Sequence, residues 1–482
     1  IPDDEGILYI GSYAFSLYTT DMNIPVTDED YDANKIPGGN TKITSVVIPD
    51  GVTEIQKYAF YNCPNLVSVT LPETCKTIRE YAFYSNTKLE TINTENVTLI
   101  GEKAFASCTS LETIDLSNVY AVGVSAFLGA SSLTSVDLSS LRIAGKEVFK
   151  DTTSLTNVIF NDNTKLSYGM FVNSGLTSIE LGMNRIPDFA FANCANLTSV
   201  VIKNDLISLG EGAFSGCTKL TSFVFEGEVE WIYDQAFYNC LLLQTLDLPN
   251  SKIKFGSYVF YKCESLDTIG FKEKTEIESI GGNTFKDTKL SRFIVDSNNM
   301  LYTVKNDGSL LTSKDGSTII LAAPKASYGD LVIDSNITAI AKGAFSGVDA
   351  ITTVTFQGTS IDIGDYAFAN ISGLTTVTLP TGSSTIGNYA FHSCSALTAV
   401  NNLANATAIG NYAFAISGII EATIGSNVNV CEGAFFKSSI ATVNINSNVE
   451  LGMGVFQRCA SLRTVNMLGD NLIIGDACFS ND

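Results

Sequence analysis

The sequence predicts an α/β solenoid, a right-handed and curved stack of short repeated coils. The first observation is a fixed period, because the anchor phenylalanines at 191, 214, 237 and 260 are each separated by 23 residues. The second is that the same apolar positions recur before and after each anchor. A period of about 20 to 50 residues is typical of solenoids, in which one repeat is too small to bury its own apolar side.

The half of each repeat that follows the anchor predicts a short strand. With the anchor as position zero, Leu stands near +6 and apolar residues stand at +9 and +11, as in Leu220, Phe223 and Phe225 after Phe214. The alternation of apolar and polar residues is that of a half-buried strand. We expect these strands to form a parallel ladder on the concave side of the solenoid.

The half that precedes the anchor predicts a short helix or 3-10 turn on the convex side. An Ile, Leu or Val stands five residues before the anchor and Ala commonly stands directly before it, as in Leu209 and Ala213 before Phe214. These offsets place the side chains on one face of a single helical turn. The apolar faces of neighbouring repeats must then stack on one another.

The repeated pattern Ala-Phe-x-x-Cys-x-x-Leu, with Ala213, Phe214, Cys217 and Leu220 as one copy, resembles the BspA-like leucine-rich repeat family. The resemblance covers roughly residues 42 to 482 apart from one insert. It implies a leucine-rich-repeat solenoid. It also implies a bacterial or protozoan surface protein of the adhesin type that binds host or partner macromolecules.

The chain divides into four segments. Residues 1–41 are predicted to be an N-terminal cap with an acidic loop, 42–292 a first leucine-rich repeat array, 293–330 a small β-meander insert, and 331–482 a second array continuous with the first. The insert is predicted from two Asp-Gly turns between apolar runs. The chain stops three residues after Phe479, so we expect the array to end within a repeat or in an improvised cap.

The acidic loop carries the carboxylates Asp21, Asp28, Glu29, Asp30 and Asp32. Calcium binding by these residues is an alternative interpretation. Their spacing does not match an EF-hand loop. The net charge of the chain is −21, which argues against nucleic acid and anionic membranes as partners. Only 16% of residues are charged, which suits an extracellular or cell-surface protein. No stretch of about 18 apolar residues occurs, and the sequence as given contains no export signal or anchor.

Eight of the eleven cysteines stand at +3 from an anchor, where other repeats carry Asn, Ala, Thr or Ser. This exchange selects for small size, so we expect buried, reduced thiols rather than a disulfide framework. Cys75, Cys431 and Cys478 lie outside this column.

The sequence predicts no enzyme, no cofactor and no metal site. His392 is the single histidine and is expected to be exposed and inert, which leaves no His-paired nucleophile elsewhere. No Cys/His set has zinc-site spacing. A hydrolase that uses Asp115 and Asp137, which share one column in adjacent repeats, is an alternative that would require a deep pocket around both carboxylates.

The strand face that points out of the core is the predicted binding surface. Position +8 (+7 in short repeats) is a column of hydroxyl residues from Ser68 to Thr464, whose stacking favours strand pairing. The neighbouring +10 row mixes carboxylates with apolar residues, as protein-contact surfaces do; its members are Asp115, Asp137, Ile159, Glu180, Val201, Val224 and Asp247.

We therefore predict a non-enzymatic, secreted or cell-surface adhesion protein. It would be a monomer that binds a protein or glycoprotein ligand of a host or neighbouring cell through the concave face. One alternative is a carbohydrate-binding module that uses rows of exposed tyrosines, among them Tyr58, Tyr61, Tyr258 and Tyr261. Another is a structural spacer without a ligand.

Overall fold

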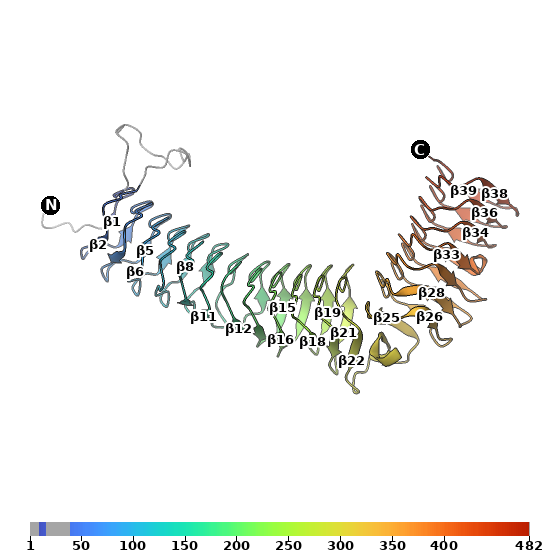
Figure 1. The fold of residues 1–482 in the computed structure, drawn as a ribbon, viewed down its shortest axis with the longest axis horizontal. Coiled ribbons are helices and arrows are strands. Elements are labelled where there is room, and N and C mark those ends of the chain that lie inside the picture. Colours follow the sequence, from blue (N-terminus) through green and yellow to red (C-terminus); the bar gives the residue numbers. More distant parts are fainter. Residues whose placement is uncertain (1–8, 16–38, 482) are drawn as a thin grey trace. The chain divides into compact units, whose positions relative to one another are not determined.

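The protein is described by a computed structural model that covers residues 9–15 and 39–481. The acidic residues of the predicted N-terminal loop lie outside these described residues. The chain forms two compact units, the first made of Ile1–Leu243 with Ile253–Cys263 and the second of Gln244–Lys252 with Glu264–Asp482 (Figure 1). Both units are stacks of parallel-strand coils, which confirms a solenoid of repeats.

Most coils contribute two short strands. We call the strand that carries positions +8 to +11 the leucine strand, and the strand that carries the residue five before the anchor the isoleucine strand. In the first unit the leucine strands are β2 (Ser45–Val47), β4 (Ser68–Thr70), β6 (Thr91–Ile92), β9 (Ser135–Asp137), β11 (Asn157–Ile159), β12 (Ser178–Leu181), β14 (Ser199–Ile202) and β16 (Ser222–Phe225).

The isoleucine strands of the first unit form the second face of each coil. They are β1 (Tyr9–Ile10), β3 (Glu54–Ile55), β5 (Thr77–Ile78), β7 (Leu99–Ile100), β8 (Ala121–Val122), β10 (Ile143–Ala144), β13 (Arg185–Ile186), β15 (Leu206–Leu209), β17 (Val229–Ile232) and β19 (Lys252–Phe255). Ile10 pairs with Ile55, so the segment before Phe15 repeats this half of the motif.

The second unit repeats the arrangement. Its leucine strands are β18 (Thr245–Leu248), β20 (Thr268–Phe271), β22 (Arg292–Val295), β26 (Gly329–Ile333), β28 (Ile351–Phe356), β30 (Thr376–Thr378), β32 (Ala399–Asn401), β34 (Glu421–Ile424), β36 (Thr442–Ile445) and β38 (Thr464–Met467). Its isoleucine strands are β21 (Glu276–Ser279), β27 (Ala339–Ile340), β29 (Ile361–Ile363), β31 (Ser384–Ile386), β33 (Ala406–Ile409), β35 (Asn429–Val430), β37 (Glu450–Leu451) and β39 (Ile473–Ile474).

Three further strands interrupt the second unit between β22 and β26. β23 (Tyr302–Lys305), β24 (Leu310–Ser313) and β25 (Thr318–Ala322) pair antiparallel in chain order, and the first connection is a 3-10 helix, η1 (Asn306–Gly308). β25 then pairs in parallel with β27. The segment is therefore part of the isoleucine-strand sheet of this unit.

The predicted convex helices are wrong. Among the described residues the only helices are η1 and a second 3-10 turn, η2 (Leu403–Asn405), and neither contains an anchor Phe. Residues two before and two after the anchor take positive φ, as at Tyr58 (58°) and Asn62 (50°). Their N–H groups donate to the next coil, Tyr58 to the Glu80 carbonyl and Asn62 to the Tyr84 carbonyl. These inter-coil bonds replace the bonds of a helix.

The core of each unit is a single file of anchor rings. In the first unit the rings from Phe15 to Phe260 stack on one another with centroid separations of 4.6 to 6.1 Å. In the second unit the rings from Phe345 to Phe479 stack at 4.9 to 5.4 Å. Because the interior anchors of both files are fully buried, apolar burial and ring stacking between coils hold the array together.

Candidate functional site

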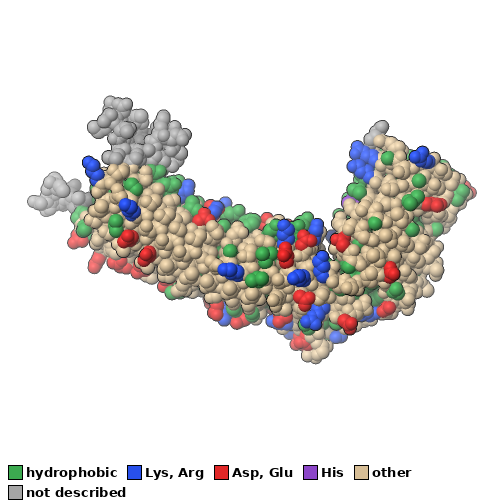
Figure 2. All heavy atoms as spheres, in the orientation of Figure 1, with side chains coloured by type: hydrophobic (Ala, Val, Ile, Leu, Met, Phe, Trp, Pro, Cys, Tyr) green, Lys and Arg blue, Asp and Glu red, His purple; other side chains and the backbone are tan. Residues whose placement is uncertain are grey.

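The outward face of the leucine strands carries polar side chains in register. The predicted hydroxyl column is observed: Ser178 pairs with Ser199 and Ser199 with Ser222 in the first unit, and Thr245 pairs with Thr268 in the second. Figure 2 shows that most of the visible surface is uncharged, with acidic and basic side chains scattered over it. A face of hydroxyls and scattered charges presents little chemistry besides hydrogen bonding.

The predicted +10 row lies on this outward face in two short runs within the first unit. Asp137 pairs with Ile159, whose side chain is 50% exposed. Glu180 pairs with Val201, and Val201 pairs with Val224, which is 42% exposed. Because directly paired residues of neighbouring strands touch side by side, the second run forms a carboxylate next to two valines.

The seven predicted residues do not lie on one continuous strand ladder. Asp115 lies outside any strand, and its carboxylate accepts the N–H and the hydroxyl of Ser117 at 2.9 and 2.6 Å. Asp137 accepts the Ser139 N–H at 2.9 Å. Asp247 belongs to the second unit and pairs with Gly270. β11 and β12 lie in different sheets, so no ladder connects Ile159 to Glu180.

Lys203, which was not predicted as a site residue, forms ion pairs beside the +10 row. Lys203 Nζ lies 3.4 Å from the Glu180 carboxylate and 3.3 Å from that of Glu226. Lys203 and Glu226 line an open, polar cavity of about 720 Å³ together with Asp162, Asn163, Lys165, Gly182, Asn184, Asn204, Asp205 and Gly227. Neither Asp115 nor Asp137 lines this cavity.

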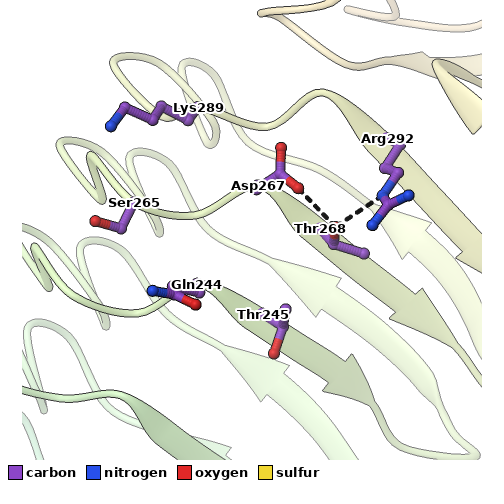
Figure 3. A pocket seen from close by; sticks show the side chains of 7 residues that line it. All are labelled: Gln244, Thr245, Ser265, Asp267, Thr268, Lys289 and Arg292. Carbon is purple, nitrogen blue, oxygen red and sulfur yellow. Dashed lines mark hydrogen bonds between the residues drawn. The ribbon is translucent and has the colours of Figure 1, made fainter.

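A second cavity, of about 270 Å³, lies on the leucine strands of the second unit (Figure 3). The Thr268 hydroxyl donates to Asp267 at 3.1 Å, and Arg292 Nε donates to the Thr268 hydroxyl at 3.3 Å. Arg292 pairs with Thr268 and therefore occupies the hydroxyl column itself. The signal in the sequence is a cation in a column that otherwise consists mainly of Ser and Thr.

Tyrosine rings of neighbouring coils stack on one another in the predicted rows. Tyr58 lies face to face with Tyr81 at 5.0 Å, and Tyr61 with Tyr84 at 5.2 Å. Tyr258 meets Tyr261 edge-on at 5.5 Å. Stacking therefore covers a ring face of Tyr58 and of Tyr61, whereas Tyr258 is 38% exposed.

His392 is half-buried rather than exposed, which corrects that expectation. Its ring lies 5.6 Å from the ring of Tyr389, and its Nδ1 lies 2.9 Å from the Ser393 hydroxyl. Partial burial lowers the pKa of His392 below its usual value, because it disfavours the charged imidazolium.

The repeat motif decides the family. The BspA-type leucine-rich repeat region matches residues 39–141, 94–185, 184–305, 325–439 and 362–482. The chain belongs to the BspA-type leucine-rich repeat family. No curated protein matches this BspA-type chain.

Several solved leucine-rich repeat proteins are similar to this chain. One from Bacteroides ovatus is 19% identical, with 90% of this chain and 85% of that one covered and a TM-score of 0.41. One from Eubacterium ventriosum is 21% identical, with 62% and 74% covered and a TM-score of 0.46. A leucine-rich cell surface protein from Faecalibacterium prausnitzii is 17% identical, with 94% and 97% covered and a TM-score of 0.34.

Within residues 9–15 and 39–481 of this BspA-type protein, no group of three or more His, Cys, Asp or Glu side chains has a geometry that would hold a metal ion. No helix within these ranges is long and apolar enough to cross a bilayer.

Proposed function

We propose that this BspA-type protein is a non-enzymatic adhesion protein, secreted or held at a bacterial cell surface. It recognises a protein or glycoprotein of a host or neighbouring cell through the outward face of its leucine strands. The observation that carries the proposal is the pairing of Glu180 with Val201 and of Val201 with Val224. Half-exposed apolar side chains beside a carboxylate, on a rigid sheet, match the composition of protein-contact surfaces.

The low charge content of the chain supports an extracellular location, and the net charge of −21 disfavours nucleic acid as the partner. The proposed contact residues are Asp115, Asp137, Ile159, Glu180, Val201, Val224 and Asp247. The apolar members Ile159, Val201 and Val224 supply the desolvation energy, and the carboxylates orient the partner.

The proposal is tested by binding to mucin and to reconstituted extracellular matrix in biolayer interferometry. A chain with Ile159→Asp, Val201→Asp and Val224→Asp is expected to bind at least about tenfold more weakly, because charges replace the desolvated centre of the surface. Ile143→Asp is the control, because Ile143 is a 56% exposed apolar residue on an isoleucine strand of the same unit. Unchanged binding by the triple variant would refute the proposed face.

A further inference from the structure

β26, one of the leucine strands that end a sheet in the second unit, has an open outer edge. Among the described residues β26 pairs only with β28, and the Gln357 N–H donates to the Ile333 carbonyl at 3.0 Å. In a parallel ladder, alternate residues direct their backbone groups to opposite sides. Leu331 and Ile333 therefore face β28, and the N–H and C=O groups of Asp330 and Val332 point to the open edge. Such an edge is a template for another strand.

A cavity of about 630 Å³ lies along this edge. Asp330, Leu331 and Val332 line one side, and Arg292 at the start of β22 lines another. Tyr328 also lines the cavity and donates its hydroxyl to the Ser309 carbonyl at 2.9 Å.

The edge of β22 is covered by the insert. Gly308 of η1 lies so close to the Phe293 carbonyl that a Cβ on Gly308 would approach its oxygen to 2.8 Å. The accessible backbone groups at this cavity are therefore those of β26.

The charges and apolar groups at the edge indicate which peptide fits. Asp330 lies in the hydroxyl column, pairs with Thr353 and accepts the Thr353 hydroxyl at 2.8 Å. Asp307 also lines the cavity, so the lining holds two carboxylates and one guanidinium, that of Arg292. The chain as a whole carries a charge of −21, which favours a basic partner. Val332 is 47% exposed on the same face, two residues from Asp330.

We propose that the open edge of β26 binds an extended peptide of a partner protein by strand addition. The peptide places a Lys or Arg against Asp330 and an apolar side chain, two residues away, against Val332. In this mode backbone hydrogen bonds supply affinity and alternate side chains supply specificity. The site uses none of the residues of the +10 row, so either proposal can fail without the other.

The test uses the full chain and a fluorescein-labelled peptide, Ser-Thr-Lys-Thr-Val-Thr-Ser, in fluorescence anisotropy. A matched peptide with Glu in place of Lys is expected to bind more weakly. Val332→Pro removes the N–H that points to the open edge and leaves Leu331 and Ile333, which direct their backbone groups to β28, unchanged. This variant is expected to bind the Lys peptide about tenfold more weakly, because a backbone hydrogen bond and the contact with the valine side chain are lost.

A charge variant keeps the proposal testable if the proline disturbs the fold. Asp330→Lys should reverse the preference, so that the Glu peptide binds better than the Lys peptide. The control is Glu421→Lys, because Glu421 occupies the same column on β34, another terminal strand, and is exposed. Glu421→Lys should bind both peptides as the unaltered chain does. The proposal is overturned by the absence of saturable binding up to about 1 mM, by equal binding of the two peptides, or by an Asp330→Lys chain that keeps the original preference.

Discussion

Several residues three positions after the anchor Phe donate a side-chain hydrogen bond. The Cys217 thiol donates to the Phe191 carbonyl of the preceding coil at 3.3 Å, and Cys263 donates to Phe237 at 3.0 Å. Where Thr152 replaces Cys, its hydroxyl donates to the Phe149 carbonyl at 2.6 Å. A small side chain with an S–H or O–H group therefore satisfies a carbonyl beside the buried rings.

The buried thiols of this column should be chemically inert in the folded protein. Burial raises the pKa of Cys108 and of Cys394 to about 12, against an ordinary value of 9.0. At pH 8 their thiolate fraction should therefore be about a thousandfold smaller than in the unfolded chain, since only the thiolate reacts. Iodoacetamide labelling followed by mass spectrometry is expected to modify Cys431 first, because it alone is half-exposed.

The same raised pKa values predict alkaline sensitivity of the fold. A thiol whose pKa is raised in the folded state stabilises the fold fully below pH 9, and that contribution is lost as the pH rises toward about 12.

In the labelling experiment, modification of Cys108 as fast as of Cys431 in the native protein would contradict the burial of Cys108. The small size of this column was evident from the sequence, but the carbonyl acceptors of Cys217 and Cys263 were not, because those carbonyls belong to another coil.

At the scale of the element, the turn around the anchor depends on two left-handed residues. Most coils place Gly, Asn, Asp or Ser two positions after the anchor, which suits positive φ. Ile416 is an exception, with φ of 57° and a side chain that is 43% exposed. A β-branched residue in this conformation is strained.

Exchanging the residue types between two coils measures that strain. Ile416 and Asn370 hold the same position, and each donates its N–H to the next coil at 2.8 Å. Ile416→Asn is expected to raise the free energy of unfolding by about 0.5–1 kcal/mol, and Asn370→Ile to lower it by about 1–2 kcal/mol. Urea unfolding followed by circular dichroism would check both values. Destabilisation by Ile416→Asn would mean that burial of this isoleucine outweighs its backbone strain.

The same turns explain why the helices were predicted wrongly. Offsets of five and one residues before the anchor fit one face of a helical turn, and they fit equally well a strand followed by a tight turn. The polar, turn-forming residues at +2, such as Asn62, Asn193 and Asn239, were the available signal against a helix. The strand after most anchors was predicted correctly because its alternation extends over four residues with a single phase; after Phe105 only an isolated bridge at Thr113 forms.

At the scale of the whole molecule, contacts between neighbouring coils replace a globular core. The recurring apolar positions were sufficient to predict the stack, since each repeat copies the same contact with the next. The candidate site was harder to predict, because the break in the ladder between Ile159 and Glu180 arises from how coils pair and not from any motif within a coil. The open edge of β26 likewise results from the strands that precede it.

A stack that is stabilised between neighbours should lose stability locally. Phe237 in the first unit and Phe391 in the second are fully buried, and each stacks on the ring before and after it. Phe237→Ala or Phe391→Ala should cost about 3–5 kcal/mol through the lost burial and the cavity left behind. Hydrogen–deuterium exchange is expected to rise in the coils adjacent to each substitution and to stay unchanged in the other unit, because coils contact only their neighbours. Val47→Ala, at a side chain that is 76% exposed, is the control and should change exchange nowhere beyond its own strand. Equal loss of protection across both units after either Phe substitution would show instead that the whole chain unfolds as one cooperative body.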